Sequence, residues 1–257
     1  MELPPNKFKR AIQSGKLQIG LWSMLSSHVT VEVIAGAGFD WIVLDTEHAP
    51  NELPMVYSQL QAATGGTAQP VVRIPWNDMV TIKRYLDIGA QSLLIPCVET
   101  EEEARNAVAS TRYPPEGKRG FAAASRASAF GRIQDYVHAC DHELCLLLQV
   151  ETKTGLENLE AIAGVEGVDG VFIGPGDLSA ALGHVGDAKH PEVQAAIEDA
   201  IKRILGCGKP AGILTPDESL ARRYIELGCV FAAVGSDISI LARVSEQLAA
   251  RFKTQPR

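Results

Sequence analysis

Eight apolar, β-branched runs of four to eight residues recur along this chain of 257 residues, and each gives way to a stretch with helical spacing. Polar side chains close several runs: His48 follows WIVLDTE, Arg73 follows PVV, Glu151 ends LCLLLQVE and Asp177 follows VFIGPG. The separations of 25 residues (48 to 73) and 26 (151 to 177) fit one strand, one helix and two short loops. Such residues should gather at one end of a parallel barrel, where barrel enzymes carry out their chemistry.

The alternation of elements predicts an α/β fold. Strands are expected over 19–25, 41–45, 70–74, 92–98, 144–151, 170–174, 211–215 and 231–235. Helices are expected over about 29–37, 53–63, 77–87 and 238–252, after a capping box of Thr100 and Glu103, and after Pro216 and Asp217. Alternating units predict a parallel sheet, and eight of them favour closure into a (β/α)₈ TIM barrel. The continuously apolar strands fit burial on both faces.

Length and composition restrict the class of protein. A single (β/α)₈ barrel typically has about 250 residues, so the chain is expected to form one domain over residues 1–257. A hydrophobic content of 46% suffices for a large core. The formal charge of −7 argues against a nucleic-acid surface, which needs a concentrated positive field.

Cysteine usage and apolar segments indicate the cellular setting. Five cysteines, an odd number without a CxxC motif, favour reduced thiols over disulfides or a zinc site. The first sixteen residues contain no apolar region like that of a secretory signal, and no segment approaches the apolar length that spans a bilayer. We therefore expect a cytoplasmic protein with no membrane or nucleic-acid partner.

Two segments interrupt the regular alternation. Residues 111–136, TRYPPEGKRGFAAASRASAFGRIQDY, are too long for an ordinary βα loop. Residues 174–192, GPGDLSAALGHVGDAKHPE, are rich in glycine and contain only a short helical piece. The first of these is predicted to be a functional loop, because binding residues concentrate on long loops carried by a rigid scaffold.

The carboxylates of Glu151 and Asp177 are predicted to lie at the ends of neighbouring strands. Hard oxygen ligands of this kind suit Mg²⁺ or Mn²⁺, which keep water or substrate oxygens in their remaining positions. The alternative is that Glu151 caps the helix opened by Thr152 and that Asp177 caps the turn at Leu178. Two adjacent carboxylates are costly to bury without a cation, which favours the metal site.

Arg73 and His48 are candidates for acid–base and electrostatic chemistry. Arg73 lies within an apolar strand, where its guanidinium must meet either a substrate carboxylate or enolate, or a carboxylate of the neighbouring strand. The motif DTEH places Asp45 three residues before His48, a spacing that allows the carboxylate to orient the imidazole. The alternative for His48 is an ordinary polar loop residue.

Several long motifs extend over residues 6–252, among them GLWSMLSS, AGAGFDWIVLDTEHAP, QPVVRIPWND, TRYPPEGKRG, VEGVDGVFIGPGDLS and FAAVGSDISILAR. They resemble the metal-dependent pyruvate aldolases of the HpcH/HpaI aldolase/citrate lyase family. Within that family the resemblance is to aldolases for 4-hydroxy-2-oxoheptanedioate and for 2-keto-3-deoxy sugar acids. It implies a (β/α)₈ barrel that forms a homohexamer, a trimer of dimers, with its C-terminal helix exchanged between subunits.

The resemblance also implies roles for individual residues. The metal, Mg²⁺, Mn²⁺ or Co²⁺, would be bound by Glu151 and Asp177, and no organic cofactor is expected. The catalytic residues would be the base His48, the stabilising Arg73, and the supporting acids Asp45 and Asp87, the latter reaching in from a neighbouring subunit. Substrate contacts are expected from Gln149, Gly176, Asp177, Arg73, Trp22 and Leu214. Departures at Thr46 and Gly176, and a shorter RGFAAASRAS loop, concern the binding site of the aldehyde acceptor.

The resemblance implies retro-aldol cleavage of a 4-hydroxy-2-oxoacid to an aldehyde and pyruvate, or a related 2-oxoacid such as hydroxypyruvate, in aromatic or sugar-acid catabolism. A lyase acting on a CoA thioester and a barrel that only binds are the alternatives. The last segment adds a prediction of its own. Ile238, Leu241, Val244, Leu248 and Phe252 form one helical stripe, with Ala242 and Ala249 beside it, that must cover the chain's own barrel or a neighbour's.

Overall fold

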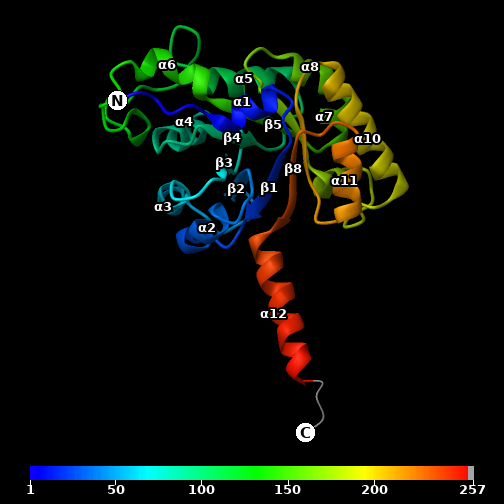
Figure 1. Cartoon of the computed structure of the whole chain (residues 1–257). Coiled ribbons are helices and arrows are strands. Elements are labelled where there is room, and N and C mark those ends of the chain that lie inside the picture. The colour runs from blue at the N-terminus through cyan, green and yellow to red at the C-terminus, as the bar shows by residue number, and fades with distance from the viewer. Residues whose placement is uncertain (254–257) are drawn as a thin grey trace.

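The eight strands form one closed, parallel barrel in which neighbours in sequence are neighbours in space and β8 pairs with β1 (Figure 1). The computed structural model describes residues 1–253. The strands are β1 Gln18–Ser23, β2 Trp41–Asp45, β3 Gln69–Arg73, β4 Ser92–Ile95, β5 Cys145–Val150, β6 Gly170–Ile173, β7 Ala211–Leu214 and β8 Phe231–Ser236. The predicted TIM barrel is confirmed.

One helix precedes the first strand, the other helices follow the strands, and most of them form the outer layer. They are α1 Lys7–Gln13, α2 His28–Ala35, α3 Leu53–Ala63, α4 Met79–Asp87, α5 Glu101–Thr111, α6 Tyr136–Glu143, α7 Lys153–Glu157, α8 Leu159–Gly164, α9 Pro175–Ala181, α10 Pro191–Gly206, α11 Glu218–Glu226 and α12 Asp237–Lys253, with a 3₁₀ turn η1 at Arg126–Ser128. The predicted capping box is present, because Thr100 accepts from the Glu103 amide and Glu103 accepts from the Thr100 amide. The predicted start of α11 is also confirmed, with Asp217 as its N-cap.

The amino-terminal end of the barrel interior is closed by aromatic side chains. Phe8 on α1 packs against Trp41 and Phe231, at ring-centroid distances of 5.3 and 5.9 Å. Trp22 continues this cluster toward the carboxyl ends of the strands, with its ring 5.5 Å from that of Phe172. We call these five rings the floor of the barrel. All five are buried, and they fill the amino-terminal half of the barrel interior.

Two strand glycines make room for the floor. A Cβ added to Gly20 would lie 2.3 Å from the Trp41 ring, and one added to Gly212 would lie 2.0 Å from the Phe231 ring. Both distances are far below van der Waals contact. The aromatic floor therefore requires that these two positions carry no side chain.

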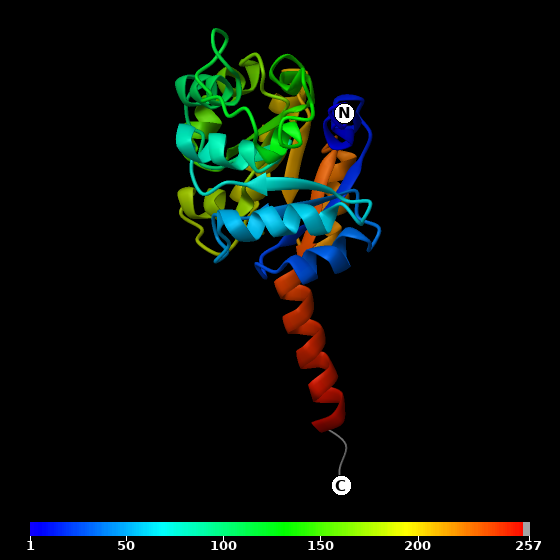
Figure 2. The same ribbon diagram turned by 90° about the vertical axis from the view of Figure 1, so that its left-hand side faces the viewer.

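Helix α12 leaves the barrel instead of packing on it (Figures 1 and 2). The predicted apolar stripe is exposed along its length: Leu241 is 57% exposed and Phe252 75%. Only Asp237, at the start of the helix, is buried. The stripe thus does not cover the chain's own barrel, which rules out one of the two arrangements expected for it.

Within residues 1–253, no helix combines the length and apolarity needed to cross a bilayer. All five cysteines are free thiols.

Candidate active site

The register of the barrel places Asp45 beside Arg73. Asp45 ends β2, Arg73 ends β3, and the two residues are direct partners in the parallel ladder. Their side chains form a bidentate ion pair, with Nε to Oδ1 at 2.9 Å and Nη2 to Oδ2 at 2.6 Å. Asp45 is fully buried, so the paired guanidinium is what makes its negative charge tolerable there. The alternative partner expected for Arg73, a carboxylate of the neighbouring strand, is thus present.

The Asp45 carboxylate has three further donors. Trp22 Nε1 donates to Oδ2 at 3.3 Å, and the backbone amides of Glu47 and His48 donate to Oδ1 at 3.0 and 3.4 Å. We expected Asp45 to orient the His48 imidazole. Over the described residues no hydrogen bond joins that carboxylate to the ring, because the ladder turns Asp45 toward Arg73. Asp45 instead fixes the backbone of the loop that carries His48.

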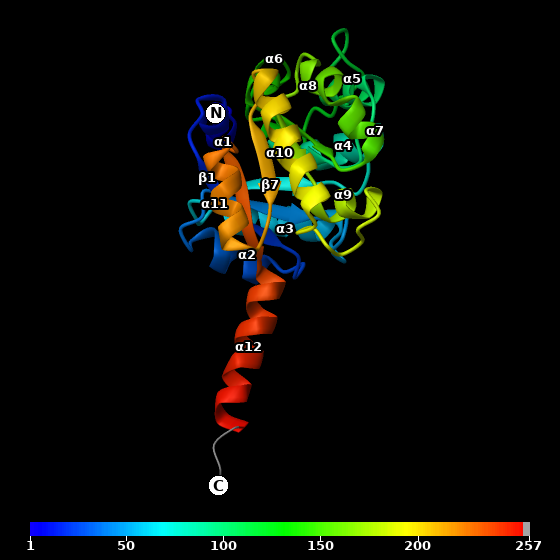
Figure 3. The same ribbon diagram turned by 90° about the vertical axis from the view of Figure 1, so that its right-hand side faces the viewer.

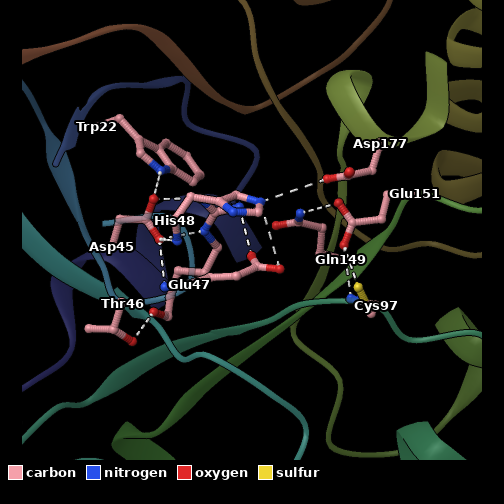
Figure 4. Close-up of polar contacts among 10 residues, drawn as sticks. Trp22, Asp45, Thr46, Glu47, His48, Cys97, Gln149, Glu151 and Asp177 are labelled. Atoms are coloured by element: carbon pink, nitrogen blue, oxygen red, sulfur yellow. Dashed lines mark hydrogen bonds and ion pairs between the residues drawn. The ribbon is translucent and has the colours of Figure 1, made fainter. Parts of the chain in front are cut away.

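His48 lies at the open end of the barrel and is surrounded by carboxylates (Figure 4). Its Nε2 is 3.9 Å from Glu47 Oε1 and 4.0 Å from Asp177 Oδ2, and its side chain is 55% exposed. Glu47 also forms an ion pair with Arg73, at 2.9 Å from Nη1. Arg73 is therefore held between two carboxylates while the His48 ring remains accessible to a ligand.

Glu151 is buried at the end of β5 and takes no part in capping a helix. Its Oε1 accepts from the Cys97 amide at 2.9 Å, and its Oε2 accepts from the Gln149 side-chain amide. The N-cap of α7 is Thr152, which accepts from the Gly155 amide. Burial, together with the charge of Asp177, raises the pKa of the Glu151 carboxyl. A cation at this point would offset the cost of that buried charge.

Asp177 lies in the first turn of α9, and Gly174, not Asp177, is the N-cap of that helix. The Asp177 side chain is 57% exposed and points toward His48 (Figure 4). The neighbouring Gly176 is open: a Cβ built there meets no atom within 4 Å. Gly176 is exposed and lies in the first turn of α9, where backbone amides have no acceptor within the helix, so its amide can donate to a small ligand.

Two site residues were not among the candidates chosen from the sequence. Glu47 contacts both Arg73 and His48, and its position two residues after Asp45 in DTEH was the available signal. Cys97 approaches Glu151 through its backbone and through Sγ, at 3.4 Å. Burial and the Glu151 charge raise the Cys97 pKa to about 12, so the thiol stays protonated.

The remaining substrate-lining candidates lie between the floor and the rim. Trp22 is buried and the Arg73 guanidinium lies 5.0 Å from its ring centroid. Leu214 is half-buried against the same aromatic cluster. Gln149 is buried, and its Oε1 has no hydrogen-bond partner in the described residues. A buried amide oxygen without a donor indicates a place where a ligand or water completes the site.

Asp87 does not join this group within one chain. It ends α4, which runs back from the carboxyl end of β3 toward the opposite end of the barrel. Its Oδ1 accepts from Arg119 Nη2 at 3.0 Å, and Arg119 is buried between Tyr113 and Tyr136. The segment 111–136, predicted to be a functional loop, thus packs against Asp87.

The departure at Thr46 has a structural counterpart. The Thr46 hydroxyl is buried and donates to the Arg73 carbonyl oxygen at 2.6 Å. A second bond to the same oxygen comes from the Thr46 amide at 3.0 Å. Thr46 therefore ties the end of β2 to the end of β3 directly beside the ion pair.

A closed (β/α)₈ barrel with carboxylates, a histidine and an arginine at the carboxyl ends of its strands defines a barrel enzyme. Residues 18–243 match the model of the family described as HpcH/HpaI aldolase/citrate lyase. The chain belongs to this family.

Relatives of known activity narrow the class further. A pyruvate aldolase of Rhizobium etli is 59% identical over 99% of this chain and 100% of its own length. A 4-hydroxy-2-oxo-heptane-1,7-dioate aldolase of Klebsiella pneumoniae is 56% identical over 96% of this chain and 94% of its own. The crystal structure of a Burkholderia cenocepacia member of the family has a TM-score of 0.94 at 38% identity, covering 97% of this chain and 100% of that one. The chain is an aldolase, a carbon–carbon lyase.

Proposed function

We propose that this protein catalyses the reversible, divalent-metal-dependent cleavage of a 4-hydroxy-2-oxoacid to an aldehyde and pyruvate, or a related 2-oxoacid such as hydroxypyruvate. The observation that carries the proposal is the convergence of Glu151, Asp177, Arg73 and His48 at one end of the barrel. The name of the similar pyruvate aldolase supports pyruvate as the 2-oxoacid product, and the name of the heptanedioate aldolase supports a 4-hydroxy-2-oxoacid as the substrate.

The donor set fits a hard divalent cation. Glu151 and Asp177 would hold the ion, with Glu47 close by: Glu47, Cys97 and Glu151 have ligand atoms within 4.8 Å of one another. Carboxylate oxygens with room for water or substrate are the environment that Mg²⁺, Mn²⁺ and Co²⁺ accept. Because Mg²⁺ and Mn²⁺ prefer hard oxygen donors, we do not expect the softer Cys97 thiol to be a ligand. When bound, the ion supplies the Lewis acid that favours the enolate of the 2-oxoacid.

Arg73 is proposed to stabilise the enolate oxygen. Its guanidinium is fixed by Asp45 and Glu47, so its positive charge is already in place before the substrate binds. A preorganised charge of this kind stabilises the transition state more than the ground state. The Gly176 amide is proposed to donate to the 2-oxoacid, and the unpartnered Gln149 Oε1 is proposed to accept from a substrate hydroxyl or a water molecule beside it.

His48 is proposed as the base that removes the C4 hydroxyl proton in cleavage and returns it in synthesis. Its exposed ring can reach a bound substrate, directly or through a water molecule. The His48 Nε2 lies 3.9 Å from Glu47 Oε1 and 4.0 Å from Asp177 Oδ2, so the ring stands directly beside the proposed metal ligands. Asp45 supports His48 by holding its backbone rather than its ring.

The active site is proposed to be completed in a homohexamer, a trimer of dimers. Asp87 would support His48 of a neighbouring subunit, held in place by Arg119. The exposed stripe of α12 would pack on a neighbour's barrel, which supports the exchange of this helix between subunits. Five free thiols support a cytoplasmic setting, and the proposed reactants are small molecules with no nucleic-acid or membrane partner.

A CoA-thioester lyase is the alternative, suggested by the second half of the family's name. The two reactions differ in what is released, since only the thioester reaction yields an acyl-CoA product.

The test is a substrate screen with metal-stripped enzyme. A panel of 4-hydroxy-2-oxoacids and one malyl thioester is supplied with Mg²⁺, Mn²⁺ or Co²⁺, and 2-oxoacid release is followed by a coupled dehydrogenase. We expect metal-dependent pyruvate release from the hydroxy-oxoacids only. Full activity without metal, or borohydride trapping of a lysine imine on the protein, would overturn the metal-dependent mechanism. Turnover of the thioester alone would establish the alternative.

A further inference from the structure

Three metal-ligating side chains meet in the segment between α9 and α10, outside the site described above. The course of this segment from α9 to α10 can be followed in Figure 3. His184 lies in the connecting loop, His190 is the N-cap of α10, and Glu192 is in the first turn of that helix. One ligand atom of each lies within 4.8 Å of the other two. The proposed aldol chemistry uses none of the three.

The two imidazole rings of this cluster stack on each other. Their centroids are 3.5 Å apart with an interplanar angle of 15°. His184 Nε2 is 2.8 Å from Glu192 Oε2, and the Glu192 amide donates to His190 Nδ1 at 3.3 Å. Both histidines are half-buried, whereas the Glu192 side chain is 60% exposed. One side of the cluster is therefore open to an ion from solvent.

The side-chain contacts suit a cation. His190 Nδ1 accepts the Glu192 amide proton, so this nitrogen presents a lone pair, as a metal-bound imidazole nitrogen does. The Glu192 carboxylate lies beside His184 Nε2 and offers an oxygen ligand next to the two rings. The 3.3 Å bond to His190 is long and can be exchanged for a metal bond at small cost.

The backbone around the cluster is already fixed. The His184 amide donates to the Ser179 carbonyl at 2.7 Å, and the His190 amide donates to that of Asp187 at 3.1 Å. The Gln194 side chain holds the Ala188 carbonyl at 2.6 Å. Only side-chain rotations are then needed to bring the three ligand atoms to the separation of roughly 3.4 Å that metal–nitrogen bonds of about 2.1 Å require.

We propose that His184, His190 and Glu192 form a second metal site, which takes a transition-metal ion such as Zn²⁺, Ni²⁺ or Cu²⁺ in preference to Mg²⁺. Two imidazoles and one carboxylate are the donors that these ions select, whereas Mg²⁺ prefers oxygen alone. His184 follows Asp177 by seven residues (177 to 184), at the other end of the short helix α9. An ion here ties the loop after α9 to the start of α10, and so braces the segment that carries Asp177.

The test uses the full-length Glu151→Gln/Asp177→Asn protein, in which the proposed catalytic ligands are removed. Metal-stripped protein is titrated with Cu²⁺ alone and followed by calorimetry and electron paramagnetic resonance. We expect one equivalent with hyperfine coupling to two nitrogens, and a higher melting temperature with Ni²⁺. His184→Ala should weaken binding more than about a hundredfold, since even partners that only support a ligand contribute 10–100-fold. His190→Asn keeps an N-cap acceptor for α10 and should weaken binding similarly.

The matched control is a histidine pair elsewhere on the surface. His138 and His142 are four residues apart on α6 and exposed, so they too can chelate an ion. His138→Ala should leave the stoichiometry and the nitrogen coupling unchanged. The proposal is wrong if His138→Ala abolishes the signal, if His184→Ala and His190→Asn both preserve it, or if millimolar Mg²⁺ competes with Cu²⁺. These outcomes do not depend on the aldol reaction, so the second site and the proposed function fail separately.

Discussion

The two ends of the barrel interior have opposite chemistry. The floor consists of the rings of Phe8, Trp22, Trp41, Phe172 and Phe231, which are at most 2% exposed. The rim, at the carboxyl ends of the strands, carries Asp45, Glu47, Arg73, Gln149 and Glu151, and burial raises the pKa of both glutamates. Apolar packing stabilises the fold, whereas buried carboxylates oppose it until they meet a cation.

Trp22 belongs to both regions. Its ring packs against Phe172, and its Nε1 donates to Asp45. Trp22 thus connects the aromatic floor to the polar network of Asp45 and Arg73. The comparison suggests that changes at the rim should alter activity more than stability, and that changes in the floor should do the reverse.

The largest effect is expected from Glu151→Gln. Loss of a proposed metal ligand should reduce aldol cleavage by roughly 10⁴-fold, since the bound ion contributes several kcal/mol to the transition state. The free energy of unfolding of the metal-free protein should stay equal or rise, because a destabilising buried charge is gone. Steady-state kinetics and urea titration measure the two quantities. Cleavage within tenfold of wild type would contradict the proposed role.

Trp41→Ala tests the floor. Removing this buried ring should lower the free energy of unfolding by about 3–5 kcal/mol, while the folded fraction keeps its kcat. Trp76→Ala is the control, because Trp76 is 58% exposed and its removal should cost less than about 0.5 kcal/mol. A Trp41 variant as stable as wild type, or one that is stable but inactive, would contradict the expectation that the floor governs stability and the rim governs activity.

Arg73→Ala and His48→Ala should separate two steps at the rim. Arg73→Ala should lower both aldol cleavage and the exchange of pyruvate methyl protons by about 10²–10³-fold, because both require the enolate. His48→Ala should lower cleavage by about 10²-fold and spare the exchange. Deuterium exchange followed by NMR gives the second rate. Equal losses of both activities in both variants would refute the separate roles.

The raised pKa of Glu151 gives a smaller, pH-dependent effect. In metal-free protein the folded state keeps this proton to a higher pH than the unfolded state, whose carboxyl has a pKa near 4.5. Stability must therefore fall as the pH rises from about 4.5 through the raised pKa. Denaturant titrations at about pH 5 and pH 7.5 should show that Glu151→Gln gains stability over wild type at the higher pH. A gain that is the same at both values would show that Glu151 is not shifted.

The smallest effect is expected outside both regions, at the capping box of α5. Thr100→Ala removes an acceptor for the Glu103 amide and should cost about 1 kcal/mol in unfolding free energy, with kcat unchanged. Thr100→Ser keeps the hydroxyl and should restore most of the loss. Thermal unfolding of the three proteins is the measurement, and an equal loss for both variants would exclude the cap as the cause.

The sequence predicted the barrel well because hydrophobic periodicity is a local property, but it could not reveal the partners of individual side chains. Strand β4 ends at Ile95, short of the predicted residue 98, because Pro96 cannot donate and Cys97 turns with a φ of 53° toward Glu151. Helix α1 was not predicted, since its seven residues carry only Phe8 and Ile12 as an apolar signal. Its role depends on contacts with strands far away in sequence.

The same contrast between local sequence pattern and contacts distant in sequence applies to the candidate active site. The carboxyl ends of strands must meet at one rim, so His48, Arg73, Glu151 and Asp177 could be chosen from their positions alone. The partner of Asp45 depends on ladder register, which pairs it with Arg73 instead of the His48 ring. Register is set by the whole closed sheet and leaves no mark in the DTEH motif itself.

Helix α12 has a consequence for how the protein reaches its final state. An isolated helix of 17 residues is marginally stable in water, and the apolar side of this one is exposed. The barrel can form by a unimolecular process, and the proposed exchange of α12 between subunits would make the final packing of this helix depend on an encounter with a second chain. Folding would then be a first-order reaction followed by a second-order one. The concentration of the chain would decide which of these two steps limits the overall rate.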